Sequence, residues 1–288
     1  MNGPIALADA ADPRILQAAA ELAETENWTP LLLGGDVAEI PTGTEHIVLE
    51  PGVSPLDQLA ELVGSGEAAA GIAGSLSTSA SVIRAGLRRL RPPGGLVSAC
   101  FAIKTGERWS TYADCVVTPE PEVEQLARIA IDAADHHRRL FGVEPKVAML
   151  SFSTHGSADH PRVAAVREAT ALIRETRPDL DTDGEVQFDV AVDPVVARHK
   201  APSSAVAGEA NVLVFPSLEA ANIAYKVAER VGGARALGSF VLGLAKPWVD
   251  LSRGCSVADI VDTARLLASS NPTATGEAGS HEHKKAVA

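Results

Sequence analysis

The stretch KVAMLSFSTHGSADHPRVAAVREATALIRET, residues 146–176, contains the alternation of elements that decides the fold. An apolar run at 147–150 ends in a loop of Ser, Thr, His and Gly, and a helical pattern follows at 161–176. Similar apolar runs occur at 31–33, 97–103, 212–215 and 240–244, and further helices are expected at 13–24, 79–90, 122–140, 218–231 and 257–268. This repetition predicts an α/β fold, in which helices cover a sheet and ligands bind at the loops that follow the strands.

The amino-acid composition argues against nucleic acids and anionic membranes as binding partners. The chain has 288 residues, 46% hydrophobic and 22% charged, so it is long enough for one large domain or two modest ones. Lys and Arg number 25 against 37 Asp and Glu, which gives a net charge of −12. Without a basic block, we expect no nucleic-acid partner and no binding to an anionic membrane surface. A few local arginines must therefore hold any anionic ligand.

The cysteines and the termini predict a cytoplasmic protein. Cys100, Cys115 and Cys255 are widely spaced, so they indicate neither a disulfide framework nor a metal site. The first residues lack the features of a signal peptide, and no apolar run is long enough to span a membrane. From residue 269 to 288 the apolar periodicity is lost, and we expect a disordered tail there.

The densest candidate site is KPWVDLSRGCSVAD, residues 246–259, where a strand ending near Leu244 is expected to lead through a loop into a helix starting near Ser256. Ser252 and Arg253 precede the predicted helix N-terminus, where backbone NH groups favour an anion and a guanidinium can bind phosphate. Asp259 lies in the first turn. Its carboxylate either caps the helix or accepts a proton from a nucleophile, and spacing alone leaves both interpretations open.

Two weaker signals lie elsewhere. In SFSTHGS, residues 151–157, the hydroxyls of Ser153 and Thr154 and the backbone at Gly156 suit an anion, although such loops are also ordinary turns. His155 is either an acid or base or a solvated loop residue. Arg84, Arg88 and Arg91 form a basic stripe on and just after the helix at 79–90. The stripe is either solvated, or it places Arg84 at the mouth of a cleft that binds a phosphorylated ligand.

Several motifs in one order resemble the phosphate acetyltransferase (phosphotransacetylase) branch of the phosphate acetyl/butyryltransferase family. They are KVAMLSFSTHGSA, RPDLDTDGEVQFDVA, KAPSSAVAGEANVLVFPSLEAANIAYKVAERVGG and GLAKPWVDLSRGCSVADIV, with thinner matches in IALADAADPRILQAAA and GIAGSLSTSASVIRAGL. The resemblance implies two α/β domains flanking a cleft, similar to isocitrate and isopropylmalate dehydrogenases, with the chain returning to the first domain at its end. It places residues 1–97 and 253–268 in the first domain and 98–252 in the second.

The resemblance also implies a reaction, the reversible transfer of an acetyl or short acyl group between coenzyme A and phosphate. Ser252, Arg253 and Asp259 match the family's active-site motif. Asp259 would take the proton from the coenzyme A thiol, and the thiolate would attack the acyl phosphate, while Arg253 and Ser252 stabilise charge on the carbonyl oxygen and the phosphate. Arg84 matches an arginine that binds substrate or coenzyme A. We further expect Ser153, Thr154, Gly156, Asn222 and Lys226 to contact the substrate or coenzyme A.

Between Val48 and Ala70 the chain is shorter than is usual in the family. This shortening leaves an alternative open, a catalytically weak relative that binds coenzyme A or acyl phosphate as a regulatory or partner-binding module. A dehydrogenase is a distant third, because no glycine-rich nucleotide fingerprint supports it. The resemblance implies coenzyme A as a cosubstrate, no bound prosthetic group or metal, and a homodimer.

Overall fold

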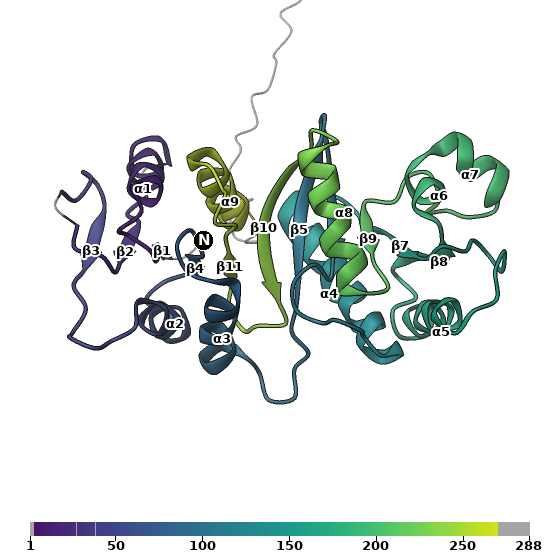
Figure 1. Ribbon diagram of the computed structural model, residues 1–288, viewed down its shortest axis with the longest axis horizontal. Coiled ribbons are helices and arrows are strands. Elements are labelled where there is room, and N and C mark those ends of the chain that lie inside the picture. The colour runs from purple at the N-terminus through teal and green to yellow at the C-terminus, as the bar shows by residue number, and fades with distance from the viewer. Residues whose placement is uncertain (1–2, 27, 38, 270–288) are drawn as a thin grey trace, which may run out of the picture.

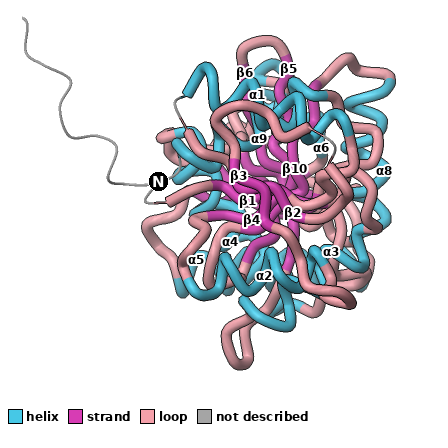
Figure 2. Tube along the Cα trace, turned by 90° about the vertical axis from the view of Figure 1, so that its left-hand side faces the viewer, coloured by secondary structure: helices cyan, strands magenta, loops and turns pink. Residues whose placement is uncertain are grey.

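A single sheet of eleven strands crosses the whole molecule in the computed structural model, which describes residues 3–26, 28–37 and 39–269 (Figure 1). The strand order is β3-β2-β1-β4-β11-β10-β5-β6-β9-β7-β8. Figure 2, which looks along the sheet from the β3 end, shows the strands stacked through the centre with helices above and below. The predicted α/β class is therefore confirmed.

Two sections of parallel strands meet at an antiparallel centre. One section contains β1 (Ile5–Leu7), β2 (Leu31–Leu33), β3 (Glu45–Ile47), β4 (Ala70–Ala73) and β11 (Trp248–Asp250). The other contains β6 (Arg108–Ala113), β9 (Val212–Val214), β7 (Lys146–Leu150) and β8 (Asp181–Val186). Between them, β10 (Arg235–Leu242) runs antiparallel to β11 and to β5 (Ser98–Thr105), and β5 runs antiparallel to β6. The two parallel sections consequently point in opposite directions.

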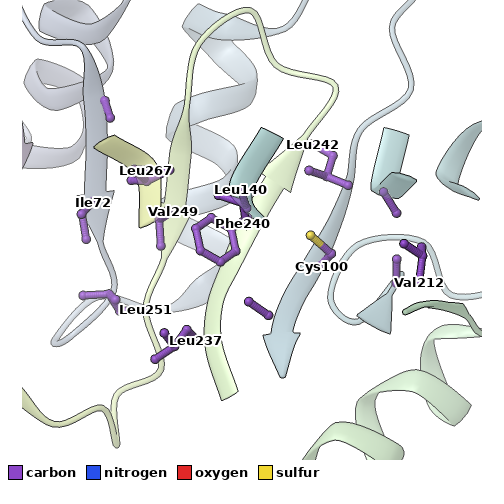
Figure 3. Close-up of a cluster of buried hydrophobic side chains, with 14 of the residues drawn as sticks. Ile72, Cys100, Leu140, Val212, Leu237, Phe240, Leu242, Val249, Leu251 and Leu267 are labelled. Atoms are coloured by element: carbon purple, nitrogen blue, oxygen red, sulfur yellow. The ribbon is translucent and has the colours of Figure 1, made fainter. Parts of the chain in front are cut away.

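Helices cover both faces and create three apolar cores. The largest core lies under α1 (Pro13–Glu26), α4 (Val123–Phe141), α5 (Pro161–Thr176) and α9 (Val257–Ser269). On the opposite face, α2 (Pro55–Ser65) and α3 (Ser79–Leu90) cover the first section, while α6 (Phe188–Val192), α7 (Pro194–Lys200) and α8 (Leu218–Arg230) cover the second. Figure 3 shows Phe240 of β10 in this core, which it shares with Val249 of β11 and Leu140 of α4. The largest core therefore spans both sections without a break at the centre.

The packing of the Trp248 side chain explains why β11 lies beside β4 in the first section. Its side chain is fully buried, and its Nε1 donates to the carbonyl of Val82 at 3.2 Å. A Cβ atom at Gly71 would lie 2.7 Å from the indole ring, and one at Gly86 would lie 3.0 Å from it. Only glycine at these two positions leaves room for the ring, so β4 and α3 approach β11 closely.

The chain returns to its first section at the end, as the resemblance implied. After β10 it adds β11 beside β4, and α9 then packs against α1 in the largest core. Arg265 of α9 extends this contact, with its Nε 2.8 Å from Glu26 Oε1. The residue boundaries of two domains stay a prediction, since all the strands form one sheet.

Most expected elements are present, with ends shifted by a few residues. The expected loop between the strand ending near Leu244 and the helix starting near Ser256 is wrong in part, because β11 lies inside it. Three residues that follow a proline give almost no periodic signal, so pairing with β4 creates a strand that local pattern does not announce. Ser269 is helical, and residues 270–288, where the tail is expected, lie outside the described residues.

Candidate functional site

A cavity of about 960 Å³ opens on the face that carries α3 and α8. Its wall is formed by the starts of α3 and α5, by strand β5, by the loops after β6 and β9, by α8, and by the end of β11 with the residues that follow it. The lining residues are Ser79, Phe101, Val116, Pro119, Glu120, Arg162, Ser217, Leu218, Glu219, Asn222, Tyr225, Lys226, Asp250, Leu251, Ser252 and Arg253. The cavity thus lies between the two sections of the sheet, where the resemblance places a cleft.

Ser252 and Arg253 line this cavity in a tight turn between β11 and α9. The backbone NH of Cys255 donates to the Ser252 carbonyl at 2.9 Å, and the NH of Gly254 lies 3.3 Å from Ser252 Oγ. Both side chains are exposed, and no described carboxylate pairs with Arg253. An unpaired guanidinium beside a hydroxyl and backbone NH groups can bind phosphate.

Arg14 holds this turn from behind. Its Nη2 lies 2.7 Å from Asp12 Oδ2, and its Nη1 donates to the carbonyls of Arg253 at 3.0 Å and Cys255 at 2.7 Å. A further bond joins Nη2 to the carbonyl of Ser75 at 3.1 Å. Asp12 is buried, and hydrogen bonds from Arg14 outweigh the effect of burial to lower its pKa. One guanidinium therefore links the start of α1, the loop after β4 and the turn that carries Arg253.

Asp259 caps α9 and does not line the cavity. Its Oδ2 accepts from the backbone NH of Ser256 at 3.0 Å and from the Ser256 hydroxyl at 2.7 Å, while Ser256 Oγ accepts from the NH of Asp259. Arg235 lies 2.9 Å from Asp259 Oδ1. Burial raises the pKa of Asp259, but the bonds from Arg235 and Ser256 outweigh it and lower the pKa. The capping interpretation thus has a geometric basis, and proton acceptance stays a prediction.

The 151–157 loop is committed to internal contacts. Ser153 Oγ donates to Glu185 Oε1 at 2.9 Å, the NH of Gly156 donates to the same oxygen at 2.7 Å, and Thr154 Oγ1 accepts from the NH of Gln187. Ser153 and Thr154 are buried, and neither they nor Gly156 line the large cavity. Their predicted contact with substrate remains untested.

His155 in the same loop faces a different hollow. Its Nε2 lies 3.2 Å from Asp183, which also binds Arg174 at 2.9 Å, and these residues line a second cavity of about 500 Å³. The Asp183 carboxylate therefore contacts both the His155 imidazole and the Arg174 guanidinium. The structure does not bring His155 together with Ser252 and Arg253.

On α3, the predicted basic stripe separates into different contacts. Arg88 pairs with Asp57, and Arg91 donates to the carbonyl of Gly95 at 2.8 Å. Arg84 is exposed and has no hydrogen bond or ion pair with any described residue. It does not line the cavity as the side chain stands, although Ser79, at the start of the same helix, does.

Asn222 and Lys226 line the cavity from α8, one turn apart. The Asn222 amide donates to the carbonyl of Cys115 at 3.1 Å, which fixes its orientation. Lys226 contacts the hydroxyl of Tyr225, and its ammonium lies 4.1 Å from the ring centroid. Tyr225 stacks on Phe101 with centroids 4.2 Å apart. The wall therefore combines a cation and an amide with an aromatic surface.

Ser79 and Asp250 are cavity residues that sequence reasoning did not single out. Asp250 lies two positions before Ser252 in the motif KPWVDLSRGCSVAD, and this proximity is the sequence feature that could have indicated it as a site residue. Only 4% of Asp250 is exposed, and its Oδ1 has no hydrogen-bond partner among the residues that the structure describes. Burial, which disfavours the charged form, raises its pKa to about 6.

Across the described ranges, no three His, Cys, Asp or Glu side chains are grouped to hold a metal ion, and no helix has the length and apolarity to cross a membrane. All three cysteines are buried free thiols. These findings concern residues 3–26, 28–37 and 39–269.

Glu185 provides a test of the 151–157 loop. Burial raises its pKa, but bonds from Arg167, Gly156 and Ser153 outweigh this and hold the pKa at about 2, against 4.5 ordinarily. A lowered pKa contributes stability above pH 4.5 that is lost as the pH falls toward 2. Replacing Glu185 with Gln should cost about 1.5–3 kcal/mol at pH 7, the value of hydrogen bonds to a charged group, and should flatten this acid slope.

Urea unfolding at pH 7, 4 and 3 measures both effects. Glu144→Gln is the matched control, because the Glu144 side chain is 80% exposed and pairs with Arg138 at the surface. An acid slope in Glu185→Gln equal to that of the parent protein would contradict the assignment.

Comparison with known proteins identifies the family. The family model described as Phosphate acetyl/butaryl transferase matches residues 55–268. A phosphate acetyltransferase of Paracoccus denitrificans is 38% identical over 297 residues, covering 92% of this chain and 93% of its own. One from Staphylococcus epidermidis is 35% identical, covering 93% and 94%. The crystal structure of a phosphotransacetylase from Streptococcus pyogenes superposes with a TM-score of 0.79 at 32% identity, covering 93% of each chain. The chain belongs to the phosphate acetyl/butyryltransferase family.

Proposed function

We propose that the protein catalyses the reversible transfer of an acetyl or short acyl group between coenzyme A and phosphate. The observation that carries this proposal is the unpaired Arg253 beside Ser252 in a cavity of about 960 Å³. Family membership and relatives named phosphate acetyltransferase support the same reaction. No described residue favours the alternative of a binding module without turnover.

The cavity suits two anionic substrates in a protein of net charge −12. Arg253 would bind phosphate or the phosphoryl group of an acyl phosphate, assisted by the Ser252 hydroxyl and the backbone NH groups of the turn. Lys226 and Asn222 would contact coenzyme A from α8, where Tyr225 and Phe101 offer an aromatic surface. Arg84, free at the surface of α3, is a further candidate to contact the coenzyme A phosphates.

The reaction forms one bond and breaks one. The coenzyme A thiolate attacks the carbonyl carbon of the acyl phosphate, a C–S bond forms, and the C–O bond to phosphate breaks with its electron pair leaving on phosphate. Arg253 and Ser252 would stabilise the charge on the carbonyl oxygen and the departing phosphate. A thiol with a pKa near 8.5 is mostly protonated at pH 7, so a carboxylate must take its proton. The resemblance assigns this role to Asp259.

Ser153, Thr154 and Gly156 would act on substrate only if the 151–157 loop changed its contacts, because their hydrogen-bonding groups are directed to Glu185 and Gln187. Coenzyme A enters as a cosubstrate, and the proposed chemistry requires no bound prosthetic group. The expected cytoplasmic location stays a proposal, which the three buried free thiols support.

Replacing Arg253 with Ala tests the reaction and the site together. We expect release of free thiol from acetyl-CoA on addition of phosphate to fall roughly 10²- to 10³-fold, since the main stabiliser of the developing charge is lost. Repeating the assay with propionyl-CoA and butyryl-CoA defines the acyl preference. Arg89→Ala serves as the control, because Arg89 pairs with exposed Glu61 on the helix surface.

A folded parent protein with no turnover on any of the three donors would contradict the proposed function. Equal turnover in Arg253→Ala and the parent would contradict the assigned role of Arg253.

We also propose that the protein is a homodimer and that α8 contributes to its interface. Ile223 and Val227 on α8 and Val231, the C-cap residue of α8, recur every four residues and are 56%, 52% and 82% exposed. Such spacing places them on one helix face, and three adjacent exposed aliphatic residues favour burial against a partner. The resemblance to a family of homodimers supports a second copy of this chain as that partner.

Replacing Val227 with Lys should place a charge in the proposed interface and shift the protein from dimer to monomer. Light scattering after size exclusion measures the molar mass directly. Val195→Lys is the matched control, because Val195 is 54% exposed on α7, away from the α8 stripe. A parent protein that is monomeric, or a Val227→Lys variant that stays dimeric at low concentration, would contradict this interface.

A further inference from the structure

Arg235 bridges two carboxylates in the first turns of α9. It is the first residue of β10, and its Nη2 donates to Asp259 Oδ1 at 2.9 Å while its Nη1 donates to Asp262 Oδ2 at 2.8 Å. Residues three positions apart lie on the same face of a helix, so one planar guanidinium can reach both carboxylates. The two hydrogen bonds together fix the direction in which Arg235 meets Asp259.

The two oxygens of the Asp259 carboxylate are held from different sides. Oδ2 accepts from the backbone NH of Ser256 at 3.0 Å and from its hydroxyl at 2.7 Å, whereas Oδ1 accepts from Arg235 alone among the described residues. Because a carboxylate oxygen has two lone pairs, Oδ2 is saturated and Oδ1 keeps one lone pair for a proton. The side chain is 28% exposed, so a substrate can approach it.

Arg235 is anchored by more than a single ion pair. Arg265 lies 3.6 Å from Asp262 Oδ1, and its Nε lies 2.8 Å from Glu26 Oε1 on α1. A chain of ion pairs therefore joins β10 to α9 and α9 to α1. Isolated exposed ion pairs reorient easily, whereas members of a network restrain one another.

Arg235 is also the cation that acts on Asp259. Burial raises the pKa of Asp259, and the bonds from Arg235 and Ser256 outweigh it. The other titratable groups that α1, α4 and the preceding turn bring toward this end of α9 either pair with each other or are neutral between about pH 5 and 9. They are the Asp12–Arg14 pair, His136, His137 and Cys255.

We propose that Arg235 is a positioning residue of the acyl transfer, which holds the Asp259 carboxylate so that its Oδ1 faces the coenzyme A thiol. This inference rests on the proposed function. The S–H bond breaks with its electron pair remaining on sulfur, the proton moves to Asp259 Oδ1, and phosphate leaves with the electrons of the C–O bond. The proton then passes to phosphate or water. Arg235 itself touches no reacting atom.

Formation of acetyl-CoA from coenzyme A and acetyl phosphate, followed as a function of pH, tests the proposal. In Arg235→Met we expect kcat at about pH 8 to fall about 10- to 10²-fold, because the base is no longer directed at the thiol, with KM for acetyl phosphate little changed. The acid limb of kcat/KM should move to higher pH, since burial still raises the pKa of Asp259 and the opposing cation is gone. Arg235→Lys should return the limb toward its parental position without restoring kcat, because an ammonium supplies the charge but not the planar fork.

A double-variant cycle determines whether Arg235 acts through Asp259. Arg235→Met introduced into Asp259→Asn should change the residual turnover by less than about twofold, because the group that Arg235 positions is already lost. Arg177→Met is the matched control and should have parental kinetics. Arg177 likewise pairs with two carboxylates, Asp135 at 3.2 Å and Asp179 at 2.9 Å, and does not line the cavity.

Three results would overturn the proposal and leave the proposed function intact: parental kcat and acid limb in a folded Arg235→Met variant, an equal fall in the Asp259→Asn background, or a raised kcat, which would mean that Arg235 restrains the base. Should Arg235→Met fail to fold, as judged by its thermal transition, the same comparison with Arg235→Lys decides the matter. A folded parent protein without turnover would overturn the proposed function and this inference together.

Discussion

The guanidinium of Arg14 is the contact on which the arrangement of the site depends. The guanidinium pairs with the buried Asp12 carboxylate and donates further hydrogen bonds to the carbonyls of Arg253, Cys255 and Ser75. These carbonyls belong to a turn and a loop that have no regular backbone pairing of their own. A charged, planar, five-donor group is the side chain best suited to satisfy several carbonyl oxygens in fixed directions. The three carbonyls lie more than 60 residues away from Arg14 along the chain, so only the completed fold brings them to the guanidinium.

Arg14 and Arg253 therefore have different roles. Arg14 has its charge compensated by Asp12 and acts on backbone, whereas Arg253 has no described acidic partner and faces the cavity. The chain as a whole has a net charge of −12, so an arginine without an acidic partner provides a local positive charge in an otherwise acidic protein. The opposite directions of the two parallel sections, joined through β10 and β5, allow α3 and α8 to flank the cavity from the same face. The return of the chain through β11 and α9 then brings Arg253 to the gap between these helices.

The sequence alone predicts the α/β class and most elements because apolar runs and helical periods are local signals. Ser252 and Arg253, which line the cavity, are predicted as site residues for the same reason, since a turn before a helix N-terminus is visible in the motif itself. Trp248 to Asp250 were missed as a strand because their pairing with β4 is contributed by residues 70–73, far away in the chain. Ser153 and Gly156 illustrate a related limit: their spacing suits an anion, but Glu185, a long-range neighbour on β8, accepts their hydrogen bonds. Whether Asp259 caps a helix or accepts a proton depends on Arg235, which no local pattern connects to it.

Amide hydrogen exchange of residues 252–256 in an Arg14→Lys variant tests the central role of the clamp most directly. Lysine keeps the charge beside Asp12 but cannot reach three carbonyls in fixed directions, so the turn should open more often and its amides should exchange at least about tenfold faster, equivalent to about 1.4 kcal/mol. Exchange in the β7 amides should stay unchanged. Parental exchange rates throughout residues 252–256 in the folded variant would contradict the account, because the turn would then hold its shape without Arg14.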